Sequence, residues 1–545
     1  MKRRQKRGKN LKRRYQGNAS VNYVTPVVRL NPVTAFIRTS LPASLLFGLP
    51  VSSVFAGPEG GVVAAGEGNI STPNATTTNI NQASQNLIVN WESYNVNANE
   101  TVNYLQPNAQ AQALNRIFDQ NPSQIFGQIN ANGKVLLINP NGVFFKPGAS
   151  VNVGGLVASG LDISNESFMS GNHTFVNPNG TEGGMVVNQG TIQAATGGSV
   201  ALIGGAVKNE GTILATAGQV NLIAGKKVTM DFDGDGLIQY TVDEEILQNV
   251  HDLEDAVSNT GTINADGGTV LLKGSAAKDV FTNVVNNSGM VSAGKIENKG
   301  GVIRLVASGT SNSLINTGTL DASSSDSDGG TIEIYASDTT IISEDALITA
   351  ASSSDKGGYI EITGDRVGLF DTTTVDASGE TGGGEILIGG DYQGKNPDVK
   401  NAQRTYIGDN ANVIADAKSD GDGGKVIVWA DDQTQYYGHV SVRGGDNSGD
   451  AGFVEISGKQ NLDFNGTVDL NAPNGNGGTL LLDPATITIT DGGADSSPQA
   501  DVAFADAGPT TITETTIENT TSAGNATIIL EATDSITLND LTDNA

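Results

Sequence analysis

The residues best suited to chemistry in this chain are a short run of aspartates and three histidines. Asp231, Asp233 and Asp235, followed by Gly236, reproduce the first half of a calcium-binding EF-hand loop. Such a loop needs a bidentate Glu at its twelfth position, where this chain has Val242. We therefore interpret the segment as a solvated acidic hairpin. The sequence predicts no metal site, and these three aspartates are the only candidate ligands.

The histidines do not form a recognisable catalytic or metal-binding pattern. His173, His251 and His439 occur at none of the spacings typical of zinc ligands. The chain contains no Cys, which excludes disulfides and thiolate ligands, and it has no Gly-x-Ser-x-Gly elbow. A Ser-His-Asp triad stays open on sequence alone. We expect a protein that is not an enzyme and carries no cofactor.

The elements that position these residues come from an internal repeat. One half of it, Asn-x-Gly-Thr-Ile-x-Ala, begins at Asn188, Asn209 and Asn259, and more loosely at Asn287 and Asn316. The other half is Gly-Gly-x-Val/Ile-x-Ile/Leu, whose copies follow one another at 20, 50, 33, 29, 28, 26, 40, 28 and 26 residues. A repeat of this length with two insertions indicates a solenoid.

The repeat predicts an all-β fold, a right-handed parallel β-helix with an N-terminal cap. Val426 and Val428 would face the core of the coil, and Ile427 would face the solvent. The repeated Asn at one corner would form a ladder, in which each side-chain amide bonds to the backbone of the neighbouring coil. Stability would come from stacking, because one coil cannot bury its apolar face alone.

The 50-residue gap in the repeat predicts a small helical insertion. Ile246, Val250, Leu253 and Val257 follow one another at spacings of 4, 3 and 4, which is one face of a helix. Asp243 stands where an N-cap would be expected. We expect this helix to lie against the side of the shaft.

Residues 121–145 have the most distinctive sequence in the chain, NPSQIFGQINANGKVLLINPNGVFF. Asn132-Gly133 lies between two strand-like runs, which predicts a β-hairpin with a type I′ turn. The sequence Asn-Pro-Asn-Gly at 139–142 predicts a type I turn, because Pro presets φ and Asn bonds the following backbone. The stretch therefore predicts strand, hairpin, strand, turn and strand.

This wording resembles the secretion domain of two-partner-secretion exoproteins, the filamentous haemagglutinin family. Upstream segments fit the same family in the same order, Trp-Glu-Ser-Tyr-Asn-Val at 91–96 and Ala-Leu-Asn-Arg-Ile at 113–117. The resemblance implies a secretion motif with these residues: Asn115, Arg116, Asn132, Gly133, Asn139, Pro140, Asn141 and Gly142. It also implies a partner, an outer-membrane barrel transporter that recognises the unfolded secretion domain.

The charge distribution separates a leader from an acidic mature chain. The net charge is −28, yet residues 1–56 hold eleven Lys and Arg and no Asp or Glu. A short apolar stretch at 41–55 and the small residues of Val54-Phe55-Ala56 then predict a signal-peptidase site. The remaining 20 basic and 59 acidic residues exclude nucleic acid as a partner.

Four regions follow from these patterns. Residues 1–56 are an extended signal peptide, 57–310 the secretion domain and 311–490 further β-helix repeats. Residues 491–545 form a weaker repeat region, where we expect the chain to stop within a longer exoprotein.

The resulting function is a secreted or cell-surface exoprotein, extracellular after signal-peptide removal, that acts as an adhesin towards a host or neighbouring cell. Two alternatives stay open, a β-helix enzyme acting on polysaccharide and a haem-binding or haemolysin-type exoprotein. The enzyme alternative would need Asp or Arg side chains clustered on one outward strand face and repeated at the coil period. The outward positions are mixed instead: Glu333, Glu361, Leu387, Ile427 and Glu455.

Overall fold

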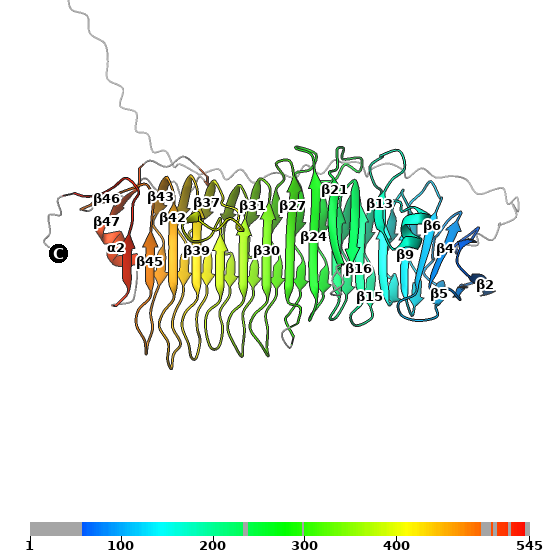
Figure 1. Ribbon diagram of the computed structural model, residues 1–545, viewed down its shortest axis with the longest axis horizontal. Helices are drawn as coiled ribbons and strands as arrows, with labels where there is room; N and C mark the ends of the chain where they lie inside the picture. Colours follow the sequence, from blue (N-terminus) through cyan, green and yellow to red (C-terminus); the bar gives the residue numbers. More distant parts are fainter. Residues whose placement is uncertain are drawn as a thin grey trace, which may run out of the picture. The chain divides into compact units, whose positions relative to one another are not determined.

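The computed structural model describes residues 57–232, 238–296, 299–491, 503–504, 509–520 and 525–539. Each coil places one short strand on each of three faces and then returns to the first face (Figure 1). Strands pair in parallel with the corresponding strand of the next coil, as β9 (Lys134–Ile138) does with β12 (Gly155–Ser159). The predicted all-β parallel β-helix is confirmed. No helix in these ranges is long and apolar enough to cross a membrane.

The three faces are long sheets with the following strands in stacking order. Face 1 contains β1 (Val62–Ala65), β4 (Asn86–Trp91), β6 (Gln112–Ile117), β9, β12, β16 (Ser199–Gly204), β19 (Gln219–Ala224), β24 (Thr269–Ala276), β27 (Val302–Gly309), β30 (Thr331–Ala336), β33 (Tyr359–Thr363), β36 (Glu385–Ile388), β39 (Lys425–Ala430), β42 (Phe453–Gly458), β45 (Thr479–Leu482) and β48 (Thr527–Leu530). Face 2 contains β7 (Ser123–Ile125), β10 (Val143–Phe145), β14 (Met185–Asn188), β17 (Ala206–Asn209), β22 (Asp255–Asn259), β25 (Asn283–Asn287), β28 (Leu314–Asn316), β31 (Thr339–Ile342), β34 (Arg366–Leu369), β37 (Arg404–Ile407), β40 (Gln433–Tyr436) and β43 (Asn461–Phe464). Face 3 contains β2 (Gly68–Asn74), β3 (Thr77–Gln82), β5 (Thr101–Leu105), β8 (Gln128–Ala131), β11 (Ser150–Val153), β15 (Thr191–Ala194), β18 (Thr212–Leu214), β23 (Thr262–Asn264), β26 (Met290–Ser292), β29 (Thr319–Asp321), β32 (Leu347–Thr349), β35 (Thr374–Asp376), β38 (Asn412–Ile414), β41 (His439–Ser441) and β44 (Thr467–Asp469).

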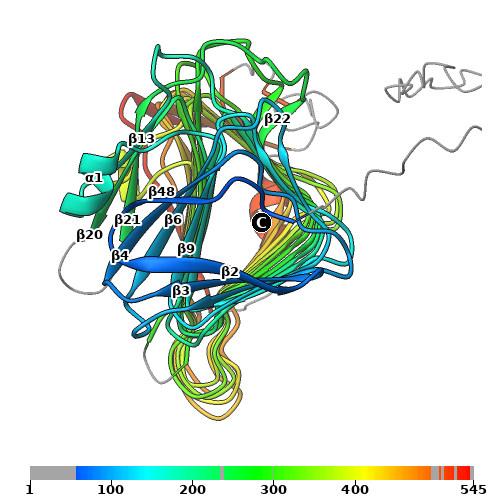
Figure 2. The same ribbon diagram turned by 90° about the vertical axis from the view of Figure 1, so that its right-hand side faces the viewer.

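Antiparallel strands close the N-terminal end of the stack. Strand β1 runs antiparallel to β4, and β2 runs antiparallel to β3. Figure 2 looks onto this end, where β2 and β3 lie across the coils behind them. The predicted N-terminal cap is therefore present. Near the other end lie α2 (Glu514–Thr520) and a small sheet of β46 (Thr486–Thr490), β47 (Thr511–Thr513) and β49 (Ser535–Leu538). The domain boundaries at 310 and 490 stay predictions.

The interior is one continuous column of aliphatic side chains. Inward positions of face 1 stack directly on one another, because the parallel register brings equivalent repeat positions together. Val200, Val220 and Val270 are three successive members, and each is fully buried. Apolar burial of this kind stabilises the fold by roughly 25 cal/mol per Å² removed from water. The core thus needs no large aromatic layer, consistent with the low aromatic content of 5%.

A ladder of five fully buried asparagines runs through the corner that follows face 2. The donor of each rung is the Nδ2 atom, and the acceptor is Oδ1 of the next asparagine, at 2.7–2.8 Å. Its members are Asn188, Asn209, Asn259, Asn287 and Asn316. The sequence predicts this ladder but assigns it backbone acceptors, whereas the rungs join side chain to side chain. The ladder ends where Ile342 takes the position opposite Asn316.

The predicted hairpin at Asn132-Gly133 is wrong. Strand β8 lies on face 3 and β9 lies on face 1, so the two strands flanking this dipeptide do not pair with each other. Each pairs instead with the next coil, β8 with β11 and β9 with β12. Gly133 does not adopt a positive φ. The same turn-forming residues that suit a hairpin also suit a corner, and the coil-on-coil pairing decides between them.

The predicted helix at 243–257 is also wrong. Residues 238–244 form β21 (Ile238–Glu244), which pairs antiparallel with β20 (Lys227–Phe232), and residues up to 254 are irregular. Ile246 is buried because its backbone bonds to the neighbouring coil at Ser275, whereas Val250 is 54% exposed. The 4, 3, 4 spacing is coincidental. Asp243 accepts a hydrogen bond from Thr229 at 2.6 Å and caps no helix.

The side of face 1 carries a small sheet and a helix in the N-terminal half. β13 (His173–Val176) pairs antiparallel with β20 and extends the β20–β21 sheet. Together with α1 (Asn165–Ser170), this sheet covers a second apolar cluster on the outward surface of face 1, which includes Leu136, Phe168 and Tyr240. The helical insertion therefore lies at 165–170.

A covering loop, residues 389–403, accounts for the second long gap in the repeat. It contains the short 3-10 turn η1 (Tyr392–Gly394) and lies over the outward side chains of β36 and β39. Ile427 faces away from the core as predicted, yet it is fully buried together with Trp429, because this loop shields both from water. Its predicted exposure is wrong for that reason.

The covering loop is fastened to later coils through Gln393. Its backbone N–H donates to Glu455 Oε2 at 3.0 Å, and its side-chain Nε2 donates to Asp483 at 3.1 Å and Glu531 at 3.0 Å. Glu455 is fully buried, although its sequence position is an outward one. Burial raises the pKa of its carboxyl to about 7, and the Asp483 charge adds to this, while hydrogen bonds from Gln393 and Ser457 and the charge of Lys425 oppose it.

Replacement of a middle rung of the asparagine ladder should destabilise the fold. Asn259→Ala removes the partner of Asn287 Oδ1 and leaves Asn209 Nδ2 with only the Gly211 carbonyl at 3.4 Å, at a cost of about 1–3 kcal/mol for each unsatisfied group. Asn316→Ile should cost less, because the following coil already has Ile342 at this position. Denaturant midpoints of the two variants measure the difference. Equal midpoints for both variants would contradict a cooperative ladder.

The raised pKa of Glu455 predicts a stability that falls as pH rises. Between the ordinary pKa of Glu and about 7, the folded chain binds a proton that the unfolded chain has released, so folding is favoured at the acidic end. The denaturant midpoint, followed by tryptophan emission, should therefore decrease between about pH 5 and pH 8.

The Glu455→Gln variant supplies the control, because acidification also lowers the general charge repulsion in this chain. The variant should lose part of the pH dependence, whereas Glu333→Gln, at an outward position paired with Arg304, should keep it. An unchanged pH dependence in Glu455→Gln would show that this carboxyl does not titrate as described.

Candidate functional site

The corner at residues 139–142 joins β9 on face 1 to β10 on face 2. The N–H of Gly142 donates to the carbonyl of Asn139 at 2.8 Å, which closes the predicted type I turn. Asn139 Oδ1 accepts from the N–H of Asn141 at 2.9 Å. Gly142 has a φ of +117°, and a Cβ atom there would lie 2.6 Å from the carbonyl oxygen of Met185. Glycine is therefore required at the fourth position of the turn for two reasons, the positive φ and the lack of space for a Cβ atom.

This corner is held by the coils on both sides. Asn139 is fully buried, and its Nδ2 donates to the Asn121 carbonyl at 3.0 Å and to Ser123 Oγ at 3.1 Å. Asn141 Nδ2 reaches back to the Asp119 carbonyl at 2.8 Å. From the following coil, the carbonyl of Ser159 accepts from the Asn139 N–H at 3.0 Å. The corner thus fixes the positions of two neighbouring coils.

The second predicted pair, Asn132 and Gly133, forms the opposite corner of the same strand. Asn132 bonds the backbone of Gln106 in both directions, as acceptor at 2.8 Å and as donor at 2.9 Å. Gln106 Oε1 accepts from the Gly133 N–H at 2.8 Å. Both ends of β9 are therefore pinned to the coil beneath by side-chain amides.

Asn115 is a polar residue inside the apolar core. Its Oδ1 accepts from the indole N–H of Trp91 at 2.9 Å, and its Nδ2 donates to the carbonyls of Ala113 and Leu136, both at 3.2 Å. The ring of Trp91 also meets Tyr94 edge to face, with centroids 5.6 Å apart. The Trp and Asn of the upstream motifs therefore meet in the first coils, where they satisfy each other.

Arg116, the next residue, points to the other side of face 1 and fastens the side element. Its Nε lies 3.0 Å from Asp162 Oδ1. Its remaining nitrogens donate to the Asn165 side chain and to the Ile163 carbonyl. These acceptors surround Ser164, which caps α1 through the N–H of Ser167. Arg116 therefore ties a strand of the early stack to the insertion that follows β12.

The structure brings most of the predicted motif residues onto two adjacent coils. Strand β6 pairs with β9, and Arg116 lies opposite Ile138, the residue before Asn139. Of the corner residues, Asn139 and Gly142 are buried, Pro140 is half-buried and Asn141 is exposed. The polar groups of Asn115, Arg116, Asn132 and Asn139 bond within the fold, so the motif as folded builds coils rather than a cleft. Sequence reasoning missed the partners Gln106, Ser123 and Asp162, which carry no local signal.

The histidines lie on three separate elements. His173 is buried beside Phe168, and its pKa is lowered to about 4 by burial and by the charge of Lys134. His251 contacts the carbonyl of Gly183 at 3.0 Å, and His439 contacts Thr467 Oγ1 at 2.9 Å. Within the described ranges, no three His, Asp or Glu side chains gather as a metal site would require.

Of the candidate calcium ligands, Asp231 lies on β20 opposite Gln239, and Asp233 and Asp235 lie outside the described residues. Val242, at the twelfth position, pairs with Val228 within the β20–β21 hairpin. An EF-hand loop wraps all twelve positions around one ion. The paired strands at both ends of this segment are the hairpin arrangement predicted from the sequence.

Comparison with known proteins identifies relatives for this arrangement. The family model described as the TPS secretion domain matches residues 57–322. The HMW1 secretion domain from Haemophilus influenzae has a similar crystal structure, with a TM-score of 0.56 and 30% identity, over 77% of this chain and 99% of that chain.

Two curated relatives carry the name heme/hemopexin-binding protein and come from Haemophilus influenzae. One is 32% identical over 259 residues, and the other, from strain Rd, is 30% identical over 246 residues. Each match covers 44% of this chain and 27% or 26% of the relative. The chain thus matches about a quarter of the length of these relatives.

Proposed function

The chain belongs to the TPS secretion domain family of two-partner-secretion exoproteins, and from this premise we propose that it is a surface or secreted adhesin. Its export partner is an outer-membrane barrel transporter of the two-partner type, and residues 1–56 act as a signal peptide that is removed first. The observation that supports this most is the family match over 57–322, whose motif residues make up the first coils of the stack.

The transporter meets this chain before it is folded. In the unfolded chain the side chains of Asn139 and Asn141 are accessible to the transporter. In the fold, Asn139 is buried against Asn121 and Ser123. Recognition and folding therefore use the same residues in succession. Once outside, each coil that stacks on its predecessor buries apolar surface and resists return through the barrel.

The proposed adhesion follows from the geometry of the stack and from the resemblance of its motifs to haemagglutinin-type proteins. Coils added along one axis carry any ligand-binding surface away from the secretion domain. A rigid core, with parallel pairing from β4 to β45 on face 1, keeps that surface extended. The cell ligand would be a surface molecule of a host or neighbouring cell.

Haem or hemopexin binding is the second candidate, since two relatives bear that name. A haem iron takes its axial ligand from a side chain such as His. His173 is enclosed in the cluster under the side sheet, whereas His251 and His439 are partly accessible and far apart along the chain. Spectral titration with haem distinguishes this candidate, and a polysaccharide depolymerisation assay tests the enzyme alternative.

Substitutions in the 139–142 corner should depress export more than stability. Gly142→Val strains a backbone at φ +117°, at a cost of about 1–3 kcal/mol, and Asn139→Ala removes buried bonds worth about 1–3 kcal/mol. These losses are small for the whole stack but large for first coils that have no folded neighbour. Secreted protein is measured in culture medium, and denaturant midpoints are measured on refolded protein.

Gly424→Val is the matched control in a late coil. A Cβ atom there would lie 2.1 Å from the carbonyl of Gly384, a closer approach than the 2.6 Å at Gly142. This variant should be exported at close to the wild-type level. Its denaturant midpoint should fall further than that of Gly142→Val. Export of Gly142→Val at the wild-type level would contradict the proposed role of the 139–142 corner in export.

The adhesin function is tested with beads coated with the full secreted protein. Coated beads should attach to epithelial or neighbouring bacterial cells, and soluble protein should compete for the attachment. Beads that bind no better than albumin-coated beads would remove adhesion from the proposal while leaving export by the partner transporter intact.

A further inference from the structure

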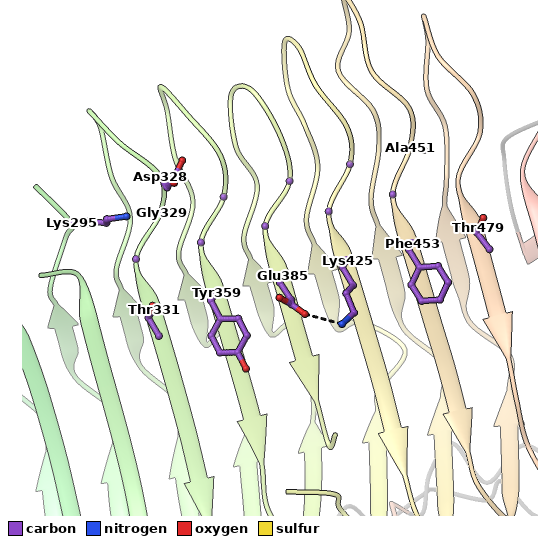
Figure 3. Close-up of a pocket in the computed structure, with 18 residues that line it drawn as sticks. Lys295, Asp328, Gly329, Thr331, Tyr359, Glu385, Lys425, Ala451, Phe453 and Thr479 are labelled. Atoms are coloured by element: carbon purple, nitrogen blue, oxygen red, sulfur yellow. Dashed lines mark hydrogen bonds and ion pairs between the residues drawn. The ribbon is translucent and has the colours of Figure 1, made fainter. Parts of the chain in front are cut away.

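A long groove runs along the coils beside the start of the face 1 strands (Figure 3). It has a volume of about 810 Å³ and extends from the coil of Gly330 to the coil of Thr479. Strands β30, β33, β36, β39, β42 and β45 are neighbours in face 1, so the groove crosses six successive coils. Its axis is parallel to the stack rather than to the strands.

Backbone forms the floor of this groove. A Gly-Gly pair precedes the strand in five of these six coils, and an Ala-Gly pair precedes β42 in the sixth. A Cβ atom at Gly357 would lie 1.7 Å from the carbonyl of Ala377, and one at Gly384 would lie 2.2 Å from the carbonyl of Gly358. Close approach of backbones therefore excludes side chains here and leaves the floor smooth.

One wall is a straight row of side chains, each contributed by the first residue of a strand. Register pairing places them one above another, and all are half-buried. In order they are Thr331, Tyr359, Glu385, Lys425, Phe453 and Thr479. Figure 3 shows this row beside the glycine pairs.

The row is symmetric in chemical character. Two aromatic rings, Tyr359 and Phe453, flank an ion pair in which Lys425 Nζ lies 2.9 Å from Glu385. The hydroxyl of Tyr359 is engaged with Glu361 at 2.7 Å, further along its own strand. Phe453 is steadied by Tyr392 of the covering loop, with ring centroids 5.8 Å apart. The rings are held in place before any ligand arrives.

The charge near the floor disfavours an anionic ligand. Asp328, Asp422 and Asp450 immediately precede the small-residue pairs and are exposed, and they outnumber Lys356, which precedes Gly357, and Lys295, which lines the same groove. Lys425 is paired with both Glu385 and Asp391, so its charge is already compensated. A polyanion would meet repulsion here, because the chain is also strongly acidic overall.

We propose that this groove binds a neutral linear polysaccharide that lies along the coil axis. Aromatic faces at Tyr359 and Phe453 would take the apolar faces of sugar rings, while Glu385 and Lys425 would exchange hydrogen bonds with hydroxyl groups. Successive coils are about 4.8 Å apart, a spacing similar to the advance of one pyranose unit in an extended chain. The wall would then present roughly one side chain to each sugar.

This inference rests on the proposed function in one respect: it names a class of ligand for the proposed adhesin. Polysaccharide binding and cell adhesion are measured in separate experiments. A peptide would also fit a groove in length, but an extended peptide seeks a free sheet edge for its backbone. The row here belongs to strands of face 1 that are each already paired on both sides. Sugar hydroxyls need no such edge.

The experiment is affinity electrophoresis of the full secreted protein in native gels. The gels contain dextran, mannan or hydroxyethylcellulose as neutral polymers, or heparin as a polyanion. At least one neutral polymer should retard the protein, and heparin should not. The double variant Tyr359→Thr/Phe453→Thr should bind at least about tenfold more weakly, because stacked aromatics carry much of the energy in such sites.

Threonine is a conservative choice for this variant, since Thr331 and Thr479 occupy the same row. Tyr335→Thr is the matched control: Tyr335 lies on β30 outside the groove, beside Lys400, and its replacement should leave retardation unchanged. Circular dichroism verifies that both variants keep the β-spectrum.

Each outcome separates the groove from adhesion. Retardation lost in the double variant and kept in Tyr335→Thr supports the groove, whether or not coated beads still attach to cells. Three results overturn it: no retardation by any of the neutral polymers, retardation by heparin alone, or equal retardation of the double variant and wild type. Beads that attach to cells in those cases would leave adhesion standing on another surface.

Discussion

The register between each coil and the next is the constraint on which this structure depends. Every strand from β4 to β45 on face 1 finds its backbone partners in a neighbouring coil, so equivalent side chains stack in columns. Inside, such a column is satisfied by aliphatic residues or by asparagines that bond one another, as Asn209 does with Asn259. A buried polar side chain in one coil therefore requires hydrogen-bonding partners in the coils on either side, a commitment that passes from coil to coil. The corner at 139–142 takes part in this commitment, because Asn139 bonds the coil beneath at Asn121 while its own N–H is taken by the coil above.

The same register determines what the outer surface can do. Where outward columns are apolar, extra segments cover them: the side sheet lies over Leu136 and its neighbours, and the covering loop lies over Ile427. Where the columns are mixed, they form straight, half-buried rows, and the row from Thr331 to Thr479 lines the groove. Insertions in the repeat are thus the places where the surface departs from periodicity. Glu455 owes its burial, and its raised pKa, to one such insertion.

The repeat spacing was enough to predict the coil, and the motif wording was enough to predict the family, because both are periodic or ordered along the chain. The Asn-Gly at 132–133 misled because a local turn signal does not state which strands pair, and here both flanking strands pair with other coils. The apolar spacing of Ile246 and Val250 predicted a helix wrongly, because only Ile246 is buried against the neighbouring coil. Within the site, the turn at 139–142 was predictable from Pro and Gly. The clasp of Arg116 on Asp162 and the contacts of Gln393 were not, because they join residues far apart in sequence through a register that only the folded stack defines.

The proposed role of the 139–142 corner in export requires that the coils around residues 121–145 form first and that later coils stack on them. Pulsed hydrogen exchange during refolding of the full-length chain tests it most directly, because it dates the protection of each strand. The account predicts that the amides of β9 and β10 become protected before those of β39 and β42. Protection of β39 and β42 first, or of all four strands at one rate, would contradict it.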